Sequence, residues 1–298
     1  MKVLNFGSLN LDYVYQVDRF VRPGETLSAR SMALNPGGKG LNQSIALARA
    51  GAQVYHGGCV GKGGEALREL LRENGVNTEL LLPTGQPQGS AVIQVTPQGE
   101  NCILLYGGSN QALEEGQIRE ALGRFQAGDC LVLQNEVNHL PLLVEEGARR
   151  GLLVVLNPSP YDERLAKVDF GQLSWLLVNE VEAEQIAGSQ DPDTVWKRLH
   201  SQYPRLSLVV TLGGQGSAAF RVQESGVEAL RQAAVPVRPV DTTAAGDTFT
   251  GYFIAGLAQG LALKDAMARA SQAAAISVTR PGAAGSIPRQ DEVERAVL

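Results

Sequence analysis

The chain has 298 residues with 26 Lys and Arg against 31 Asp and Glu, and a formal charge of −5 argues against a protein that coats nucleic acid or anionic lipid. Hydrophobic residues make up 44% of the chain, which excludes a disordered protein and allows a sizeable core. The three cysteines (Cys59, Cys102 and Cys130) lie far apart without a C-x-x-C pair, so we expect neither a disulfide framework nor a zinc site. Because no apolar run approaches the roughly 18 residues that span a bilayer, we expect no membrane partner and a cytoplasmic location.

Short apolar runs alternate with helical patterns along most of the chain. The candidate strands are Val3–Phe6, Cys130–Gln134, Leu152–Asn157, Trp175–Asn179 and Leu208–Leu212. Helical periodicity lies between them, for example at Gly64–Asn74, where Gly75 is suited to end the helix, and at Glu114–Phe125. Apolar strands that alternate with amphipathic helices predict an α/β fold of three layers with a mostly parallel central sheet. Ligands are expected at the carboxyl ends of its strands.

Two regions, Leu11–Asn35 and Ser90–Tyr106, alternate in the manner of half-exposed antiparallel strands. Pro23-Gly24 and Pro97–Gly99 are turn signals within them. We interpret both regions as β-ribbons that leave the main sheet together and form a small lid. No linker divides the chain, so residues 1–298 are expected to form a single domain that carries this lid.

Several common chemistries lack their motifs in this sequence. The three histidines share no metal-ligand spacing, and a G-x-S-x-G elbow is absent. No G-x-G-x-x-G follows the first strand, so a standard dinucleotide site is not supported. Gly37–Gly40 looks superficially like a P-loop, but Leu41 occupies the position where the Mg²⁺-binding Ser or Thr would stand.

The strongest local signal is the segment from Val240 to Phe249, a polar turn that runs into a pattern of small and apolar residues. The small residues Ala244, Ala245 and Gly246 would let a ligand approach the free N–H groups of a helix's first turn, which attract anions. Asp247 would project from the same turn, and a carboxylate beside a bound phosphate is useful when it accepts a proton from an attacking hydroxyl. An ordinary helix N-terminus, where acidic residues are common, is the alternative interpretation.

Two further segments have polar residues suited to ligands. Asn35–Gln43 contains three glycines that bring the backbone close to a partner, and Lys39 and Asn42 add donors for a polyhydroxylated molecule. Asn179 and Glu182 follow a strand and could face a Mg²⁺–phosphate group. A Gly-Gly turn before a helix and a solvated acidic helix start are the respective alternatives.

Together these segments resemble the ribokinase family of carbohydrate kinases, also called the PfkB family, from residue 4 to about residue 290. The matching motifs occur in the family's order: Gly7–Asp12, Gly37–Gln43, Asn157-Pro158, Asn179–Glu182, Thr211–Gly213 and Asp241–Phe249. One departure is the stretch Gly61–Glu65, which lacks the Asp of the family's Gly-x-Asp-x-x-Gly pattern and is about two residues shorter. That departure bears on the identity of the sugar rather than on the phosphoryl chemistry.

The resemblance implies a role for each matching position. Asp247 would be the base for the sugar's primary hydroxyl, and the amides of Ala244, Ala245, Gly246 and Asp247 would stabilise the transferring phosphoryl group. The implied sugar-binding residues are Asn10, Asp12, Gly38, Lys39, Asn42, Ala91, Ile93 and Glu136. Asn179 and Glu182 would serve the phosphates of Mg·ATP, and Thr211, Gly213 and Gly216 would line the nucleotide groove. Since many family members are activated by K⁺, ligands of that ion, largely backbone carbonyls, are implied at Asp241, Thr243, Ser277, Arg280, Gly282 and Ser286.

The sugar contacts are most similar to those of family members that act on a free pentose. The resemblance therefore implies ATP-dependent phosphorylation of ribose or 2-deoxyribose to the 5-phosphate. A nucleoside or pseudouridine kinase of the same fold is the alternative within the family, and a non-catalytic sugar-sensing relative is the alternative outside catalysis. Apolar faces on the lid, together with the resemblance, predict a homodimer that pairs lid against lid.

Overall fold

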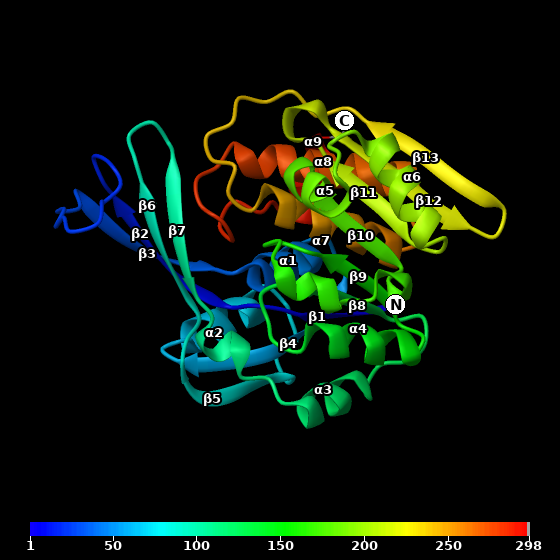
Figure 1. Cartoon of the computed structure of the whole chain (residues 1–298), viewed down its shortest axis with the longest axis horizontal. Coiled ribbons are helices and arrows are strands. Elements are labelled where there is room, and N and C mark those ends of the chain that lie inside the picture. The colour runs from blue at the N-terminus through cyan, green and yellow to red at the C-terminus, as the bar shows by residue number, and fades with distance from the viewer. Residues whose placement is uncertain (297–298) are drawn as a thin grey trace.

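The near-continuous apolar strands pair into one large sheet at the centre of the molecule (Figure 1). The computed structural model describes residues 1–296, and within this range the sheet has nine strands. They are β1 (Lys2–Phe6), β4 (Gln53–Lys62), β5 (Leu81–Pro87), β8 (Cys130–Gln134), β9 (Leu153–Asn157), β10 (Trp175–Asn179), β11 (Ser207–Thr211), β12 (Ser217–Gln223) and β13 (Gly226–Gln232). Their order is β13-β12-β11-β10-β9-β8-β1-β4-β5, and the pairs from β11 through to β5 are parallel.

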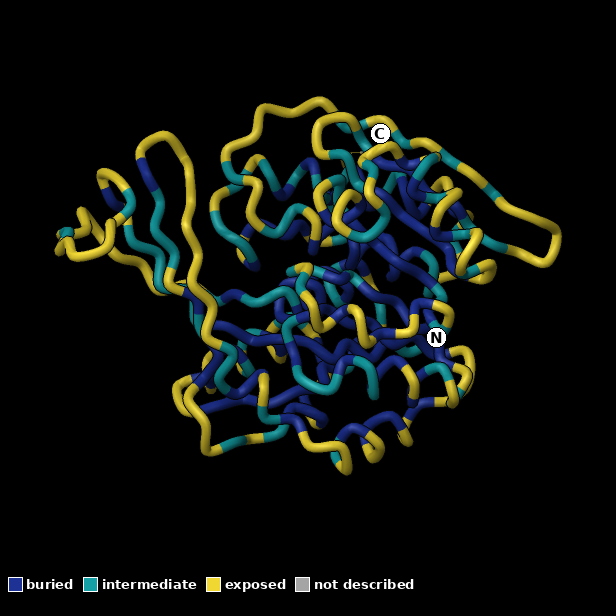
Figure 2. The backbone as a smooth tube through the Cα atoms, in the orientation of Figure 1, coloured by how far each residue is buried: buried dark blue, intermediate teal, exposed yellow. Residues whose placement is uncertain are grey.

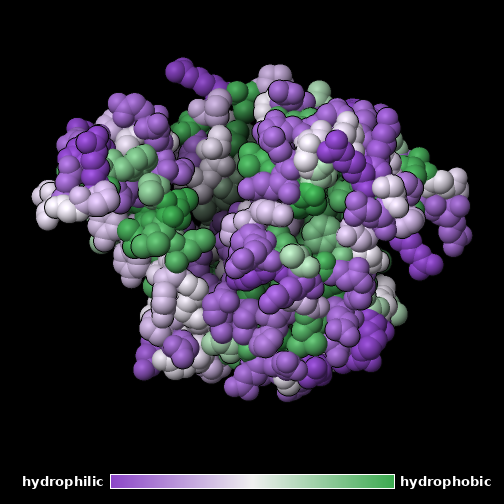
Figure 3. Space-filling model, viewed as in Figure 1, coloured by the Kyte–Doolittle hydropathy of each residue, from purple (hydrophilic) through white to green (hydrophobic). Residues whose placement is uncertain are grey.

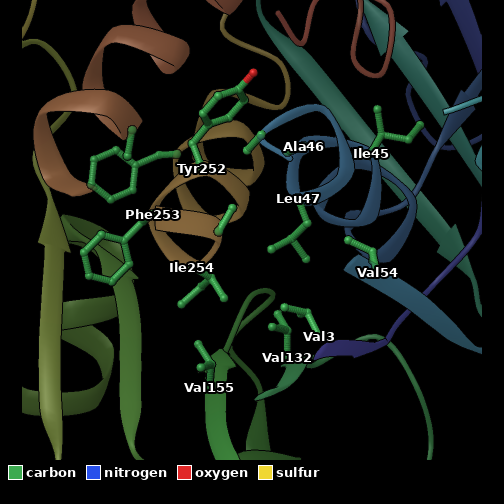
Figure 4. Packing of buried hydrophobic residues seen from close by; sticks show 14 of the residues in the cluster. Val3, Ile45, Ala46, Leu47, Val54, Val132, Val155, Tyr252, Phe253 and Ile254 are labelled. Atoms are coloured by element: carbon green, nitrogen blue, oxygen red, sulfur yellow. The ribbon is translucent and has the colours of Figure 1, made fainter. Parts of the chain in front are cut away.

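Helices cover both faces of this sheet, so successive strand residues are buried on opposite sides. In β8, for example, Val132 belongs to one apolar cluster, while Leu131 and Leu133 belong to the other. The helices are α1 (Lys39–Arg49), α2 (Glu65–Glu73), α3 (Glu115–Leu122), α4 (Leu140–Arg149), α5 (Glu180–Ala187), α6 (Pro192–Gln202), α7 (Ala245–Ala258), α8 (Leu263–Val278) and α9 (Gln290–Ala296). Figure 4 shows the first cluster, in which Tyr252, Phe253 and Ile254 of α7 face α1 and the strands. The predicted three-layer α/β fold is confirmed.

A second sheet projects from one side of the body (Figure 1). It has the order β3-β2-β6-β7 and consists of β2 (Asn10–Gln16), β3 (Ser31–Gly37), β6 (Ser90–Val95) and β7 (Asn101–Tyr106). These strands match the two regions expected to form ribbons, except that β2 begins one residue before Leu11 and β3 ends two residues after Asn35. Each ribbon is antiparallel, but β2 and β6 join the two ribbons as parallel neighbours. We call this element the small sheet, and its outer strand β7 is exposed along its whole length (Figure 2).

Several elements differ from the sequence-based expectation. The helix expected over Glu114–Phe125 ends at Leu122, and Phe125 instead packs edge-on against Tyr55 with ring centroids 5.3 Å apart. The sheet edges β5 and β12–β13 were not among the predicted strands. The sequence pattern does not predict β5 because the strand contains Pro83 and Pro87. Proline lacks a backbone N–H donor, so in sheets it occurs mainly in edge strands such as this one. Within residues 1–296, no helix combines the length and the apolar character needed to cross a bilayer.

Candidate active site

The carboxylate of Asp247 lies in the first turn of α7, at the carboxyl edge of the large sheet. Ala244 precedes this helix in the left-handed conformation (φ 61°), which turns the chain sharply into α7. The N–H of Ala245 donates to the carbonyl oxygen of Thr242 at 3.2 Å. Since first-turn N–H groups have no partner within their own helix, those of Gly246 and Asp247 are left to attract an anion.

Two amide side chains of α1 hold the Asp247 carboxylate. Asn42 Nδ2 donates to Oδ2 at 3.0 Å, and Gln43 Nε2 donates to Oδ1 at 2.9 Å. The residue is 7% exposed, and a buried carboxylate is tolerated when its oxygens accept hydrogen bonds. Gly251 lets the two helices approach this closely, because a Cβ at that position would lie 2.4 Å from the Cβ of Ala46.

Lys39 begins α1 and brings a positive charge among three carboxylates. Burial alone lowers the pKa of Lys39, but the negative charges of Asp247, Glu136 and Glu182 outweigh burial and raise it. The raised pKa keeps the ammonium group of Lys39 protonated. It lies between the Asp247 side of the site and the Glu136 side, so it can counter charge on a group transferred between them.

A cavity of about 230 Å³ brings the predicted phosphate-side residues together. Its lining includes the expected residues Lys39, Asn179, Glu182, Thr211, Ala244, Ala245, Gly246 and Asp247. Asn179 and Glu182 fix each other through a capping box at the start of α5. Asn179 Oδ1 accepts from the N–H of Glu182 at 2.8 Å, and the Glu182 carboxylate accepts from the N–H of Asn179 at 3.2 Å. Glu182 Oε1 and the second lone pair of Asn179 Oδ1 remain as hard oxygen ligands that suit Mg²⁺ or its bound water.

A second cavity of about 460 Å³ adjoins the first and shares Thr211 and Gly246 with it. Gly213 and Gly216 line it, and both adopt positive φ (51° and 100°). A Cβ at Gly216 would lie 2.0 Å from the carbonyl oxygen of Gln232, so this turn requires glycine. The remaining walls are largely apolar: Val235, Pro236, Val237, Pro239, Ala274, Ala275 and Val278. Apolar walls of this kind suit a flat heterocycle.

Polar residues on the other side of Lys39 lie where the small sheet leaves the body. Asn10 and Glu136 line a cavity of about 240 Å³. The Glu136 carboxylate accepts from Ser8 Oγ and from the N–H of Lys39, the latter at 3.2 Å. Gly38 precedes α1 with φ 96°, and a Cβ there would lie 2.8 Å from the carbonyl oxygen of Ser8. The chain therefore folds the start of α1 tightly onto this cavity.

Asp12 lies on β2, opposite Asn35 on one side and Ala91 on the other. Its carboxylate occupies the space above Gly37, where a Cβ would approach Oδ2 to 1.9 Å. Burial, followed by the negative charge of Glu136, raises the pKa of Asp12 to about 6. Ala91 is buried, while Ile93 is only partly buried two residues further along the same face of β6.

The six positions implied for a monovalent cation divide into two groups. Asp241, Thr243 and Gly282 meet, because the Asp241 carboxylate accepts from the N–H groups of Thr243 and Gly282, both at 2.9 Å. Burial raises the pKa of Asp241, but the hydrogen bond from the Thr243 hydroxyl, together with those from the two N–H groups, outweighs burial and lowers the pKa overall. The other side chains have different partners: Arg280 pairs with Glu292, Ser277 donates to Ala274 O, and Ser286 donates to Ala283 O.

Sequence analysis left several polar residues of this region without a role. Gln43 was only part of a motif, and Gln134, Asn5 and Asn110 were not singled out. All four are buried and hydrogen-bonded; Asn110 lines the cavity beside Asn10, while Gln43, Gln134 and Asn5 are not among the lining residues of the three cavities. One sequence signal could have identified such residues: an amide side chain within an otherwise apolar strand, such as Asn5 in β1. A polar group buried in this way needs a hydrogen-bond partner.

Comparison with known proteins gives consistent matches. Residues 1–290 match the family described as pfkB family carbohydrate kinase. The ribokinase of Haemophilus influenzae is 34% identical over 299 residues, covering 96% of this chain and 95% of the relative. The solved ribokinase of Thermotoga maritima is 32% identical with a TM-score of 0.86, covering 100% of this chain and 99% of that one. A ribokinase of Arabidopsis thaliana, solved with ribose and ATP, is 26% identical with a TM-score of 0.86 and covers 99% and 97% of the two chains.

The raised pKa of Asp12 predicts how stability depends on pH. The folded state binds the Asp12 proton more tightly than the unfolded state, so Asp12 destabilises the fold increasingly as the pH rises from about 4 to about 6. We expect Asp12→Asn to be more stable than the wild type at pH 7, with the difference shrinking toward pH 4. Urea unfolding at pH 4, 5, 6 and 7 measures the difference in unfolding free energy between the variant and the wild type. If this difference in unfolding free energy is the same at all four pH values, the raised pKa of Asp12 is contradicted.

Proposed function

The chain belongs to the pfkB family of carbohydrate kinases, and we propose that it is a ribokinase, which transfers the γ-phosphoryl group of ATP to the primary hydroxyl of ribose. The observation that carries this proposal is the position of Asp247, a hydrogen-bonded carboxylate in the first turn of α7. A base and an anion-binding helix terminus in one turn serve phosphoryl transfer to an alcohol. The two ribokinase comparisons at 32% and 34% identity support the choice of sugar.

In the proposed reaction, Asp247 takes the proton of the sugar's primary hydroxyl. The hydroxyl oxygen then bonds to the γ-phosphorus, and the bond from that phosphorus to the β–γ bridging oxygen breaks to release ADP. Negative charge on the transferring group faces the N–H groups of Gly246 and Asp247, and Lys39 adds a fixed positive charge. Donors that are already aimed need no reorganisation during the step.

The proposed sugar site lies between Asp247 and the small sheet. Asn42 donates to Asp247 through Nδ2, while its Oδ1 is buried without a partner among residues 1–296. An unpartnered buried acceptor is costly, so a sugar hydroxyl that donates to Oδ1 would bind favourably there. Asn10, Asp12, Gly38, Lys39 and Glu136 would contact the other hydroxyls, and Ala91 and Ile93 would form the apolar wall.

The proposed nucleotide site is the pair of adjoining cavities that meet at Thr211. The adenine would occupy the apolar cavity beside Gly213 and Gly216, with the phosphates directed toward Gly246. Asn179 and Glu182 would hold Mg²⁺ on the phosphates through its water shell. Bound there, the ion would offset the charge that develops on the oxygens of the transferring group. ATP as the phosphoryl donor is consistent with a location in the cytoplasm.

A monovalent cation, K⁺, is proposed behind the turn that precedes α7. Asp241 forms no ion pair within residues 1–296, and Arg280, two residues before its partner Gly282, pairs with Glu292. A cation held there by backbone carbonyls near Asp241, Thr243 and Gly282 would offset the carboxylate's charge. Its role would be to hold the turn in the geometry that aims the α7 amides.

A homodimer through the small sheet is proposed from its exposed apolar surface. Ile103, Leu104 and Tyr106 of β7 are 52%, 71% and 53% exposed. Figure 3 shows the corresponding apolar area where the small sheet stands beside the body. An exposed edge strand of this composition needs a partner, and a second copy related by a two-fold axis supplies one.

The substrate proposal predicts a ranking of acceptors in an ADP-release assay. The acceptors to compare are ribose, 2-deoxyribose, fructose, ketodeoxygluconate, adenosine and pseudouridine. We expect the highest kcat/KM with ribose or 2-deoxyribose, because the polar groups around Asp12 and Glu136 suit a free pentose. A preference for adenosine or pseudouridine supports the alternative nucleoside kinase, and no ADP release with any acceptor supports a sugar sensor.

Asp247→Asn tests the proposed base. Asparagine keeps the size of the side chain but cannot take the hydroxyl proton, so turnover should fall about 10²–10⁴-fold, the usual scale of general base catalysis. The affinity for ATP, measured by calorimetry, should change little. Asp265→Asn, an exposed change in the first turn of α8, is the matched control. A variant at Asp247 with more than a tenth of wild-type turnover is incompatible with the role.

Replacement of Na⁺ by K⁺ at constant ionic strength tests the monovalent site. We expect the rate with Mg·ATP to rise several-fold, because disorder in the turn before α7 misdirects donors that are worth roughly 3–4 kcal/mol each. Asp241→Asn should remove most of the response. Equal rates in Na⁺, K⁺ and a bulky organic cation show that no such ion acts here.

Light scattering at micromolar concentration tests the dimer. The wild type should have the mass of two chains, and Leu104→Lys should shift it toward one, because a charge on the exposed strand opposes pairing. Val227→Lys, which alters an exposed apolar residue on β13 at the other end of the molecule, should leave the mass unchanged. A monomeric wild type refutes the arrangement.

A further inference from the structure

A chain of buried amide side chains lies behind Asp247. It runs from Gln43 on α1 to Gln134 at the end of β8 and then to Asn5, the last residue but one of β1. Each of these three side chains has a relative exposure of 0%. The proposed mechanism uses neither Gln134 nor Asn5, although both occupy the best-protected part of the core.

The hydrogen atoms of the three amide groups are all accounted for. Gln43 Nε2 donates to Asp247 Oδ1 (2.9 Å) and to Asn157 Oδ1 (3.1 Å). Gln134 Nε2 donates to Gln43 Oε1 (2.7 Å) and to Asn5 Oδ1 (2.9 Å). Asn5 Nδ2 donates to Gly40 O (2.9 Å) and to Ser44 Oγ (2.8 Å). Both hydrogens of each of these three NH₂ groups are therefore used in hydrogen bonds.

Both ends of this chain are groups that only accept. Gly40 contributes a backbone carbonyl oxygen, and Asp247 contributes two side-chain oxygens that both accept from amides. The orientation of each amide between these ends is therefore fixed. Rotating one amide by 180° would exchange its oxygen and its NH₂ group, which would bring two acceptors or two donors face to face in the buried core. Gln134 binds the oxygen of Gln43 from the other side, so both neighbours favour the orientation in which Gln43 presents its nitrogen to Asp247.

Glycines make room for this arrangement. A Cβ at Gly7 would lie 2.3 Å from Gln134 Oε1 and 2.5 Å from the Cα of Gly40. The oxygen of Gln134 thus lies against the bare backbone of Gly7, while its nitrogen points at its two acceptors. At the far side, Ser44 Oγ accepts from Asn5 and lies 2.8 Å from His56 Nδ1. Burial lowers the pKa of His56 to about 4, so the His56 ring is neutral.

We propose that Gln134 is a positioning residue for phosphoryl transfer, which acts through Gln43 to hold the Asp247 carboxylate in the orientation that accepts the sugar's proton. The inference rests on the proposed function, because it assigns Gln134 a part in the work of that base. Gln134 bonds to Gln43 and Asn5 rather than to a residue of the three cavities, so its effect reaches the reaction through Gln43.

Gln134→Met is the primary test, since methionine keeps the length of the side chain and removes both donors. We expect kcat to fall about tenfold, which corresponds to about 1.4 kcal/mol, with the KM for ATP within about twofold of wild type. Ser44→Ala is the matched control, because it also deletes a buried polar group but leaves Asn5 bonded to Gly40 O. Ser44→Ala should lower stability in urea and leave kcat unchanged.

The double variant distinguishes positioning from general damage. If Gln134 acts through Gln43, then Gln43→Met combined with Gln134→Met should have the same kcat as Gln43→Met alone. A double variant in which the two losses multiply overturns the proposal, as does a wild-type kcat in Gln134→Met. If Gln134→Met does not fold, Gln134→Glu takes its place. A carboxyl group has at most one hydrogen where the amide has two, so the same tenfold loss is expected, and a wild-type kcat overturns the proposal.

Asp247→Asn, measured beside these variants, separates this inference from the proposed function. If Asp247→Asn retains turnover, the assignment of the base fails. If Asp247→Asn is inactive while Gln134→Met turns over like the wild type, the base stands and only the positioning role fails.

Discussion

The contact between the first turns of α1 and α7 is the constraint on which the site depends. It joins Asn42 and Gln43 to the Asp247 carboxylate across more than 200 residues of sequence. Removing a carboxylate from water costs several kcal/mol unless hydrogen bonds replace the lost hydration. The two amides supply those bonds, and Gly251 allows the helix axes to come close enough for them to form. A phosphate can then lie beside a carboxylate because α7 presents its N-terminus at the same point.

Hydrogen bonds at the base of the small sheet hold the residues of the proposed sugar site in place. Asn110, just after β7, accepts from the N–H of Leu9 at 3.0 Å and donates to Asn10 Oδ1 at 2.7 Å. The Asn10 oxygen is thereby used, and its NH₂ group is the part left for a ligand. Asp12 and Glu136 are then held close enough for their charges to interact, which is visible in the raised pKa of Asp12. A ligand whose hydroxyls donate to both carboxylates would relieve that repulsion.

The sequence was sufficient for features that depend on local pattern. Apolar strands between amphipathic helices predicted the three layers, and the small residues before Asp247 predicted a helix start in that segment, which the structure places at Ala245. Features that depend on distant partners were not predictable. Nothing near Gln134 in the sequence indicates that it will bond to Asn5 and Gln43, because these contacts exist only once β1, β8 and α1 are neighbours. The strand β5 was missed for the opposite reason, since its prolines are compatible with a strand only at the edge that the fold gives it.

The segment Gly61–Glu65 is held by a side chain from outside the segment. Gln88, 4% exposed, accepts from the N–H of Gly61 at 2.9 Å and donates to the carbonyl oxygen of Leu9 at 2.6 Å. Gly64 leaves space for it, because a Cβ there would lie 1.9 Å from Gln88 Oε1. Gln88 thus ties the segment to Leu9, which directly precedes the strand β2 that carries Asn10 and Asp12. A change in this segment therefore acts on the attachment of the small sheet, while the turn that contains Asp247 is held independently by α1.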